Sequence, residues 1–260
     1  MYILGLNLFH ADSSACLLKD GVLIAAAEEE RFRRIKHWAG FPSEAIKWCL
    51  LEADINLENV QHIALNQDAK ANLGKKIMFT LSKRPSFKML LNRFQNKYKR
   101  LSVRDHILKA FPNSEFKGSI HSIEHHTAHL SSAFHVSPFN EAVAVSVDGF
   151  GDFASTAWGT GHGIKINLEK RIYFPHSLGI FYQALTQFIG FHNYGDEYKV
   201  MGLAPYGKPI YIKQMREIVK LKTDGGFELN LDYFRHHREK INYEWDNGSP
   251  NIAVSYTHLT

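Results

Sequence analysis

Two histidines in the segment HHTAHLSSAF, His125 and His129, are four residues apart. If the segment is helical, both side chains lie on one face and can share a divalent metal ion. A zinc-protease helix would need a glutamate after the first histidine as general base, and residue 126 is a histidine. That enzyme class is therefore disfavoured. An isolated pair at this spacing is more often a set of partly exposed or capping residues.

A carboxylate that could complete such a site follows the apolar run Ala142–Val147. We expect this run to be a strand with Asp148 at its end, where open α/β sheets bind ligands. Asp148 could then add a hard oxygen ligand, and Gly149 and Gly151 would let backbone amides approach a phosphate. An ordinary hairpin turn over Asp148–Asp152 fits the pattern equally well, because Asp-Gly is a common hairpin turn.

Segments nearer the N-terminus could also act on a ligand. His10 follows an apolar strand, so its imidazole could be a general base, although a structural turn residue is the commoner role. The charge run Glu28–His37 is typical of a solvated strand edge or a helix start. Within it, Arg31 and Lys36 could instead bind an anionic ligand.

The segment Gly195–Gly207 mixes charged residues with glycine, proline and aromatic residues. It follows an apolar run, Leu178–Ile189, that predicts a helix. No regular element has the pattern of the mixed segment, so we predict a loop there. Such a loop is more often functional than a plain connection.

The elements that position these residues occur in a repeated order. In the first half we expect strands over Tyr2–Leu8, Ser13–Leu18 and Val22–Ala27, a hairpin turn at Lys19–Gly21, a helix from Pro42 and a strand over His62–Leu65. In the second half we expect strands over Ala142–Val147, Phe153–Gly159, Ile164–Ile166 and Ile172–Phe174. Two such units imply a duplicated α/β architecture with a cleft between lobes.

A basic stretch interrupts the first unit at about residues 68–112 and is helical in character. Its aromatic residues recur among the cations, which favours a solvated helical insertion with an aromatic inner face over a binding surface. For its core, residues 83–104, we expect no specific binding of RNA.

The bulk composition is that of a globular protein in a reducing compartment. The 260 residues are 45% hydrophobic, and the formal charge of +5 suits anionic ligands without implying nucleic acid. Cys16 and Cys49 each lie among apolar residues, as buried reduced thiols do. We see neither a signal peptide nor a membrane span and expect a cytoplasmic protein.

Taken together, these segments resemble the carbamoyltransferase family of nodulation and antibiotic biosynthesis. The family's motifs correspond to Ala25–His37, His125–Phe134, Asp148–Asp152, Phe174–Tyr182 and Gly195–Gly207. The resemblance implies a duplicated actin-like ATPase fold of the sugar kinase/actin superfamily. We place the first lobe at 1–141 and the start of an incomplete second lobe at 142–253. Residues 254–260 follow a polar loop and fit no element, so we expect a tail of non-native sequence there.

The resemblance also implies an ATP-dependent O-carbamoyltransferase in two parts. A C-terminal domain would make carbamoyl adenylate from carbamoyl phosphate and ATP, and the N-terminal domain would transfer the carbamoyl group to a hydroxyl, often on a sugar. Family chains are roughly twice as long as this one, so we expect the fragment alone to be inactive. Its partners would be carbamoyl phosphate, ATP and a hydroxyl-bearing small molecule, with no membrane or nucleic acid, while an oligomer stays open.

The family's functional residues carry over position by position. The metal, iron as Fe(2+) in the family, would be bound by His125, His129 and Asp148. The nucleotide would contact Lys36, Gly149, Gly151 and Asp152. His10 would be the base on the acceptor hydroxyl, and the acceptor would be bound by Asp12, Arg31, Glu197, Lys199, Met201 and Gly202. The family usually has an aspartate directly after the histidine at position 10, whereas Ala11 intervenes here before Asp12.

Two other functions remain open on the sequence. One is a transferase of the kind that makes threonylcarbamoyladenosine on tRNA, with residues 83–104 as the RNA contact. The other is a non-catalytic nucleotide-binding protein of the same fold. The segments Glu28–Phe32 and Glu197–Gly207 favour the small-molecule branch. The sequence does not name the acceptor.

Overall fold

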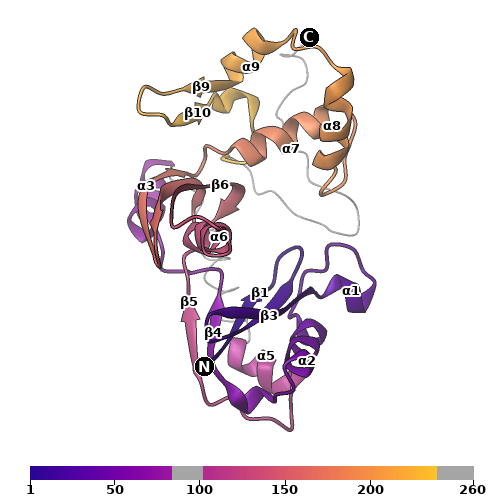
Figure 1. The fold of residues 1–260 in the computed structure, drawn as a ribbon. Helices are drawn as coiled ribbons and strands as arrows, with labels where there is room; N and C mark the ends of the chain where they lie inside the picture. The colour runs from indigo at the N-terminus through magenta and orange to yellow at the C-terminus, as the bar shows by residue number, and fades with distance from the viewer. Residues whose placement is uncertain (84–101, 239–260) are drawn as a thin grey trace. The chain divides into compact units, whose positions relative to one another are not determined.

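The computed structural model describes residues 1–83 and 102–238, in two compact units, Met1–Ala128 and His129–Thr260. Figure 1 gives the order of the elements. The core of the basic insertion and the tail at 254–260 lie outside the described residues. Among the described helices, none is long and apolar enough to cross a membrane.

The first unit is built on a five-stranded sheet in the order β3-β2-β1-β4-β5. Its strands are β1 (Tyr2–Asn7), β2 (Ser14–Lys19), β3 (Val22–Glu28), β4 (Val60–Leu65) and β5 (Ser119–Ser122). Its helices are α1 (Glu30–Arg33), α2 (Ser43–Glu52), η1 (Leu57–Asn59), α3 (Leu73–Lys83) and α5 (Val103–Ala110). Strands β1 to β3 run antiparallel, while β4 pairs in parallel with β1 and β5.

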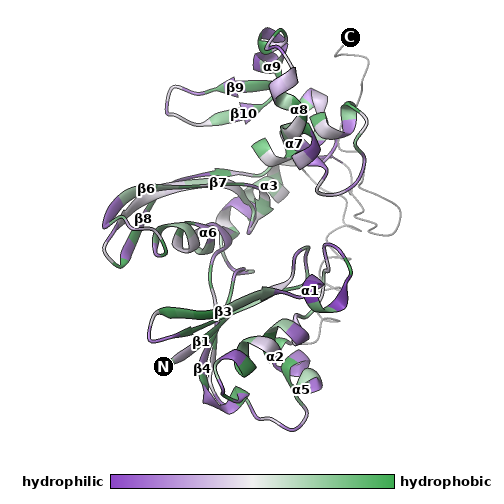
Figure 2. Ribbon diagram, turned by 45° about the vertical axis from the view of Figure 1, so that its right-hand side comes forward, coloured by the Kyte–Doolittle hydropathy of each residue, from purple (hydrophilic) through white to green (hydrophobic). Residues whose placement is uncertain are grey.

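Alternation along the strands explains where the core of this unit lies. Leu4 and Leu6 of β1 and Leu17 of β2 are buried, as expected for a strand with one face on the core. Helix α2 packs on β2 and β3 and buries Ile46 and Cys49. The apolar colouring of the strands in Figure 2 follows this layer. The core therefore holds the carboxyl end of β1, and with it the loop that carries His10.

The second unit begins with a three-stranded antiparallel sheet in the order β6-β7-β8. Its strands are β6 (Glu141–Gly151), β7 (Ala154–His162) and β8 (Lys165–Tyr173), followed further on by the hairpin of β9 (Val219–Leu221) and β10 (Phe227–Leu229). Helix α6 (His125–Phe134) spans the boundary between the units at Ala128. The other helices of the second unit are α7 (Leu178–Phe188), α8 (Glu197–Leu203), η2 (Ala204–Tyr206), α9 (Ile212–Ile218) and η3 (Leu231–Tyr233). In both units three consecutive antiparallel strands are followed by a helix, β1 to β3 by α1 and β6 to β8 by α7, as the repeated sequence pattern predicts.

Several predicted elements differ from the structure. The separate strands expected at 164–166 and 172–174 are parts of β8, which continues through polar residues because the neighbouring strand β7 supplies the hydrogen bonds. The loop expected at 195–207 is instead helical, as α8 and η2. Strands β5, β9 and β10 have too few residues for a clear alternating pattern, and the sequence did not reveal them.

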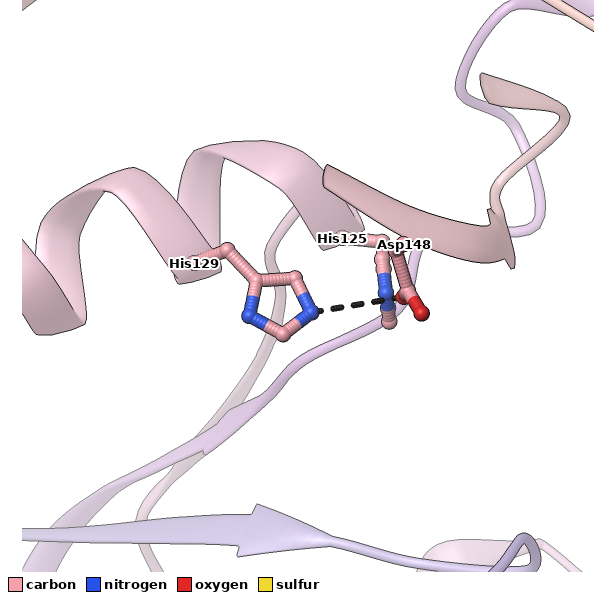
Figure 3. Close-up of side chains that lie close together, drawn as sticks. All are labelled: His125, His129 and Asp148. Carbon is pink, nitrogen blue, oxygen red and sulfur yellow. Dashed lines mark ion pairs between the residues drawn. The ribbon is translucent and has the colours of Figure 1, made fainter. Parts of the chain in front are cut away.

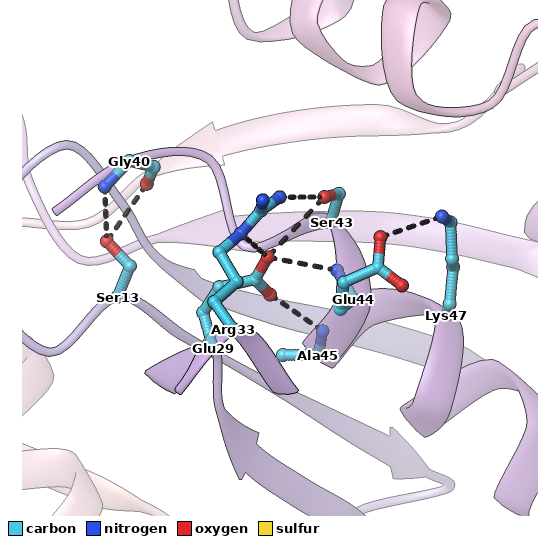
Figure 4. Close-up of polar contacts among 8 residues, drawn as sticks. All are labelled: Ser13, Glu29, Arg33, Gly40, Ser43, Glu44, Ala45 and Lys47. Atoms are coloured by element: carbon cyan, nitrogen blue, oxygen red, sulfur yellow. Dashed lines mark hydrogen bonds and ion pairs between the residues drawn. The ribbon is translucent and has the colours of Figure 1, made fainter. Parts of the chain in front are cut away.

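A buried carboxylate, Glu29, ties the start of α2 to the segment after β3 (Figure 4). Its Oε1 accepts from Arg33 Nε at 2.7 Å and from the backbone N–H of Glu44 at 3.2 Å, and its Oε2 accepts from the N–H of Ala45 at 2.8 Å. These amides are among the N–H groups that a helix leaves without an internal partner. Glu29 therefore acts as the cap of α2 from a distant position in the chain.

Replacing Glu29 with alanine is expected to lower the free energy of unfolding by roughly 1–3 kcal/mol, because it leaves Arg33 and the amides of α2 without their acceptor. Urea unfolding followed by circular dichroism measures the change. Glu44→Gln is the matched control, since Glu44 makes an exposed ion pair with Lys47, and such pairs contribute at most about 1 kcal/mol. Equal midpoints for the two variants would contradict the assigned role.

Candidate functional site

Helix α6 is held in place by its cap and by its packing. The carboxylate of Glu124 accepts from the backbone N–H of Thr127 at 2.8 Å and from its hydroxyl at 2.7 Å. It thus gives a hydrogen-bond partner to an N–H group of the first turn that has none inside the helix. Leu130 and Phe134, one turn apart, pack against Ala144 of β6 and Ala157 of β7. The helix is continuous from His125, so its anchored second half also fixes the position of its first turn.

The histidines of α6 converge with the carboxylate of β6, as the sequence predicts. One ligand atom from each of His125, His129 and Asp148 lies within 4.8 Å of the others. The Nε2 atom of His129 is 3.5 Å from Oδ2 of Asp148 (Figure 3). Two imidazoles and one carboxylate on rigid elements are a donor set that suits divalent transition metals such as Fe(2+) or Zn(2+). The trio therefore fits a metal centre with further positions for a ligand.

A second contact orients His125 within this group. Its Nδ1 lies 3.3 Å from the backbone carbonyl oxygen of Asn66. Histidine ligands commonly donate one ring N–H to a carbonyl and present the other nitrogen to the metal. With that tautomer, Nε2 of His125 carries the lone pair that a metal ligand needs. His125 is buried, whereas the side chains of His129 and Asp148 are partly exposed, so a substrate could reach the site from solvent.

The structure corrects the predicted hairpin turn at 148–152, which is shorter than expected. Strand β6 extends to Gly151, its pairing with β7 is irregular between Val147 and Gly151, and only Asp152 and Phe153 form the hairpin turn. Both turn residues have positive φ, 48° and 73°, as a two-residue turn of this kind requires. Asp148 is thus presented by a bulge inside the strand, which re-aims its side chain.

The start of α7 holds this bulge in position. The hydroxyl of Ser177 lies 3.0 Å from the carbonyl oxygen of Asp148 and 2.8 Å from that of Gly149, and it accepts from the N–H of Ile180. Gly179 lies so close that a Cβ there would be 2.6 Å from Asp148 O. By contrast, a Cβ on Gly149 would meet open space. Gly149 therefore leaves room for a ligand, and Gly179 allows the helix to approach the bulge.

We expect Gly179→Ala to weaken metal binding by roughly 10–100-fold, the usual cost of disturbing the support of a ligand. The added methyl group must displace the backbone at Asp148, since 2.6 Å is too short for a carbon–oxygen contact. Titration of this chain with Co(2+) by calorimetry measures the effect. Gly74→Ala, in helix α3 with nothing near its Cβ, should bind the metal as the unmodified chain does, and equal losses in both would refute the role.

The N-terminal candidates lie in the loop after β1 and in the segment after β3. His10 is half-buried, and its backbone carbonyl accepts from the hydroxyl of Ser13 at 3.0 Å. Asp12 lies two residues further on in the same loop. Lys36 is exposed, and Arg31 on α1 is exposed beside Glu28, 3.2 Å away. These residues all belong to the first unit.

The candidates of the predicted acceptor segment lie on α8 of the second unit. Lys199 Nζ is 2.6 Å from Oδ1 of buried Asp196, and this hydrogen bond raises the pKa of the lysine. Burial alone would raise the pKa of Asp196, but its hydrogen bonds with Lys199 and Asn193 outweigh burial and lower it. Lys199 thus has a structural partner. Glu197 accepts from Tyr182 through its backbone carbonyl, and Met201 and Gly202 are exposed.

Most of the chain matches the sequence profile of a known protein family. The profile described as "Carbamoyltransferase N-terminus" matches residues 2–245. The chain belongs to the carbamoyltransferase family. The resemblance found in the sequence is therefore confirmed. His125, His129 and Asp148 converge in a chain of the carbamoyltransferase family.

Relatives in this family include named and uncharacterised proteins. An uncharacterised protein of Synechocystis sp., sll1178, is 38% identical over 90% of this chain and 40% of its own length. The nodulation protein NolNO of Sinorhizobium fredii is 33% identical over 87% of this chain and 32% of its own length. The chain thus spans less than half of either relative.

Among solved structures, YeaZ from Pseudomonas aeruginosa is similar over 65% of this chain and 64% of its own, with 16% identity and a TM-score of 0.35. We draw no argument from a likeness of this degree. The mixed α/β class of the chain follows directly from its own sheets and helices.

The sequence did not single out the residues that support the site. Ser177 and Gly179 lie in the segment FPHSLG, where a serine before an apolar helix is a cap signal. His176, in the same segment, accepts from the N–H of Leu229 through Nδ1 at 3.0 Å, and burial lowers its pKa. This segment is therefore structural, and it holds α7 and β10 in place around the bulge.

Proposed function

We propose that this chain carries the transfer site of an ATP-dependent O-carbamoyltransferase. A carbamoyl group would pass from carbamoyl adenylate to a hydroxyl of a sugar or other small molecule. The observation that carries the proposal is the convergence of His125, His129 and Asp148, in a chain whose family is a carbamoyltransferase family. A mixed anhydride of carbamate and AMP has a phosphate beside the reacting carbon, so its transfer benefits from positive charge at that point.

We assign the formation of carbamoyl adenylate to the remainder of the full-length protein. There water would cleave carbamoyl phosphate to carbamate and inorganic phosphate. The carbamate would then attack the α-phosphate of ATP and release pyrophosphate, and the resulting carbamoyl adenylate would be used at the site carried by this chain. The chain spans 40% of the Synechocystis relative and 32% of the Sinorhizobium relative, which leaves room for such a part.

In the transfer step, His10 accepts the proton of the acceptor hydroxyl. The hydroxyl oxygen attacks the carbamoyl carbon and forms a new C–O bond. The bond from that carbon to the phosphate oxygen breaks, and AMP leaves with the electron pair. Asp12 and Arg31 are assigned to the acceptor and Lys36 to the nucleotide, and all three side chains are at least partly exposed to solvent.

The donor set of the trio fits a divalent cation, and Nε2 of His125 carries the lone pair when Nδ1 donates to the carbonyl of Asn66. Bound there, such a cation, Fe(2+) by analogy with the family, would neutralise charge on the phosphate as AMP departs. The backbone amides near Gly149 and Gly151, with Asp152 in the turn beyond, are assigned to the same phosphate region.

The full-length protein tests this function with carbamoyl phosphate, ATP and an N-acetylglucosamine oligomer as probe acceptor. We expect AMP and carbamoylated oligomer in equal amounts by mass spectrometry. Formation of AMP with the carbamoyl group found on added tRNA would support the tRNA-modifying alternative. Binding of ATP without release of AMP would support the non-catalytic alternative.

A further inference from the structure

Two loops of the first unit are joined by a set of backbone hydrogen bonds. The N–H of Phe9 donates to the carbonyl of Gly40 at 3.0 Å, and the N–H of Ser13 donates to that of Trp38 at 3.0 Å. The hydroxyl of Ser13 accepts from the N–H of Gly40 at 3.0 Å. The loop with His10 and the loop before α2 therefore hold each other in a fixed register.

Within this pair of loops, His37 contacts the carboxylate of Asp12. Its Nδ1 lies 2.9 Å from Oδ1 of Asp12, and its backbone N–H donates to Oε2 of Glu30 at 2.9 Å. Because an ionised carboxylate can only accept, Nδ1 of His37 carries the hydrogen. Asp12 and His37 both have left-handed backbones, with φ of 62° and 56°, a conformation that aspartate and histidine adopt more readily than most residues.

The arrangement leaves half of the Asp12 carboxylate open. Its Oδ1 is used by His37, whereas Oδ2 has no hydrogen bond within the described residues, and the side chain is 43% exposed. Donor atoms of Asp12, Glu30 and His37 lie within 4.8 Å of one another. The ring and backbone N–H groups of His37 each contact one oxygen of a carboxylate, Oδ1 of Asp12 and Oε2 of Glu30. What remains is one carboxylate oxygen directed to solvent from a fixed position.

We propose that His37 is a positioning residue for the acceptor: it fixes Asp12 so that Oδ2 can accept a hydrogen bond from an acceptor hydroxyl. This rests on the proposed function, which assigns Asp12 to the acceptor. The other charges near His37 are Glu30, whose Oε1 is 3.9 Å from Arg31, and Lys36 next in the chain. Without His37, the Asp12 side chain is free to turn, and acceptor affinity falls.

Three replacements of His37 separate this role from others. Asparagine places an N–H close to the position of Nδ1 and tolerates a left-handed backbone, glutamine places one close to Nε2, and alanine places none. In the full-length protein, with an N-acetylglucosamine oligomer as probe acceptor, we expect His37→Ala and His37→Gln to raise its KM roughly 10–100-fold, the cost of a lost hydrogen bond to a charged group. His37→Asn should stay near the unmodified value, and kcat should change little in all three.

Each other outcome overturns the proposal in an identifiable way. If His37→Asn is as inactive as His37→Ala and added imidazole restores the alanine variant, His37 is itself the base. If all three variants match the unmodified protein, the contact has no role. If the unmodified protein transfers nothing to the probe, it is the proposed function that fails for this acceptor class.

The contact itself is tested on this chain without any acceptor. In ¹⁵N imidazole spectra, the signal that disappears in His37→Asn belongs to His37 and should have its hydrogen on Nδ1. In Asp12→Ala that hydrogen should no longer be fixed on Nδ1. A His37 signal that is the same in the unmodified chain and in Asp12→Ala would refute the proposal whatever the activity.

Discussion

Replacing His10 with asparagine in the full-length protein is expected to abolish carbamoyl transfer while carbamoyl adenylate still forms. The expected loss in transfer rate is roughly 10²–10⁴-fold, the usual contribution of a general base. Nucleotide binding should be unchanged, because the contacts assigned to the phosphate come from other residues. Release of phosphate and AMP, followed separately from carbamoylated product, would reveal an intermediate that accumulates or is lost to water.

His121→Asn is the matched control for this experiment. His121 is exposed on β5 of the same unit, where its Nε2 lies 3.0 Å from Nδ1 of His62, and it has no part in the proposed site. Its replacement should leave transfer unchanged. If His10→Asn transfers at a rate near that of the unmodified protein, His10 is a turn residue and the base must be sought elsewhere, with Asp12 first.

Removal of His129 is expected to eliminate specific binding of a divalent cation to this chain. Affinity for Co(2+) should fall by more than about 100-fold, since losing a ligand costs more than losing a residue that supports one. In the full-length protein the same change should weaken retention of the nucleotide in the transfer site, as should His125→Ala. Calorimetric titration of Co(2+) into His129→Ala and Asp148→Asn measures the first effect.

His135 supplies the control for the metal experiment. It follows the last residue of α6, is exposed, and its ring contacts only that of Phe134 among the aromatic pairs of the described residues. His135→Ala should bind Co(2+) as the unmodified chain does. Binding that persists in His129→Ala, or that is lost equally in His135→Ala, would show that the cation is held elsewhere.

The sequence predicted the convergence of His125, His129 and Asp148 because helical periodicity and an apolar strand determine its geometry. His125 and His129 share a face in any regular helix, and the run before Asp148 could form little else than a strand. The sequence did not reveal how Asp148 is presented. The bulge in β6 depends on contacts with Ser177 and Gly179, which lie some thirty residues further on in the chain, and local patterns do not report contacts at that distance.

The helix α8 and the pair Asp12–His37 were also beyond sequence reasoning, for different reasons. Glycine and proline near Glu197–Leu203 indicated a loop, but the ion pair of Lys199 with Asp196 stabilises a short helix there. Asp12 and His37 meet because two loops exchange backbone hydrogen bonds, with both residues in left-handed conformations. Aspartate and histidine adopt this conformation only in a minority of cases, so the sequence alone does not predict it.

The central claim is that the acceptor oxygen attacks the carbamoyl carbon of the adenylate. The fate of an ¹⁸O label in the acceptor hydroxyl tests this most directly, in the full-length protein with carbamoyl phosphate, ATP and a labelled N-acetylglucosamine oligomer. The account predicts that the label stays in the carbamoylated oligomer and that the AMP released contains none. Label in the phosphate of AMP, or an oligomer that carries AMP in place of a carbamoyl group, would place the attack at phosphorus and contradict it.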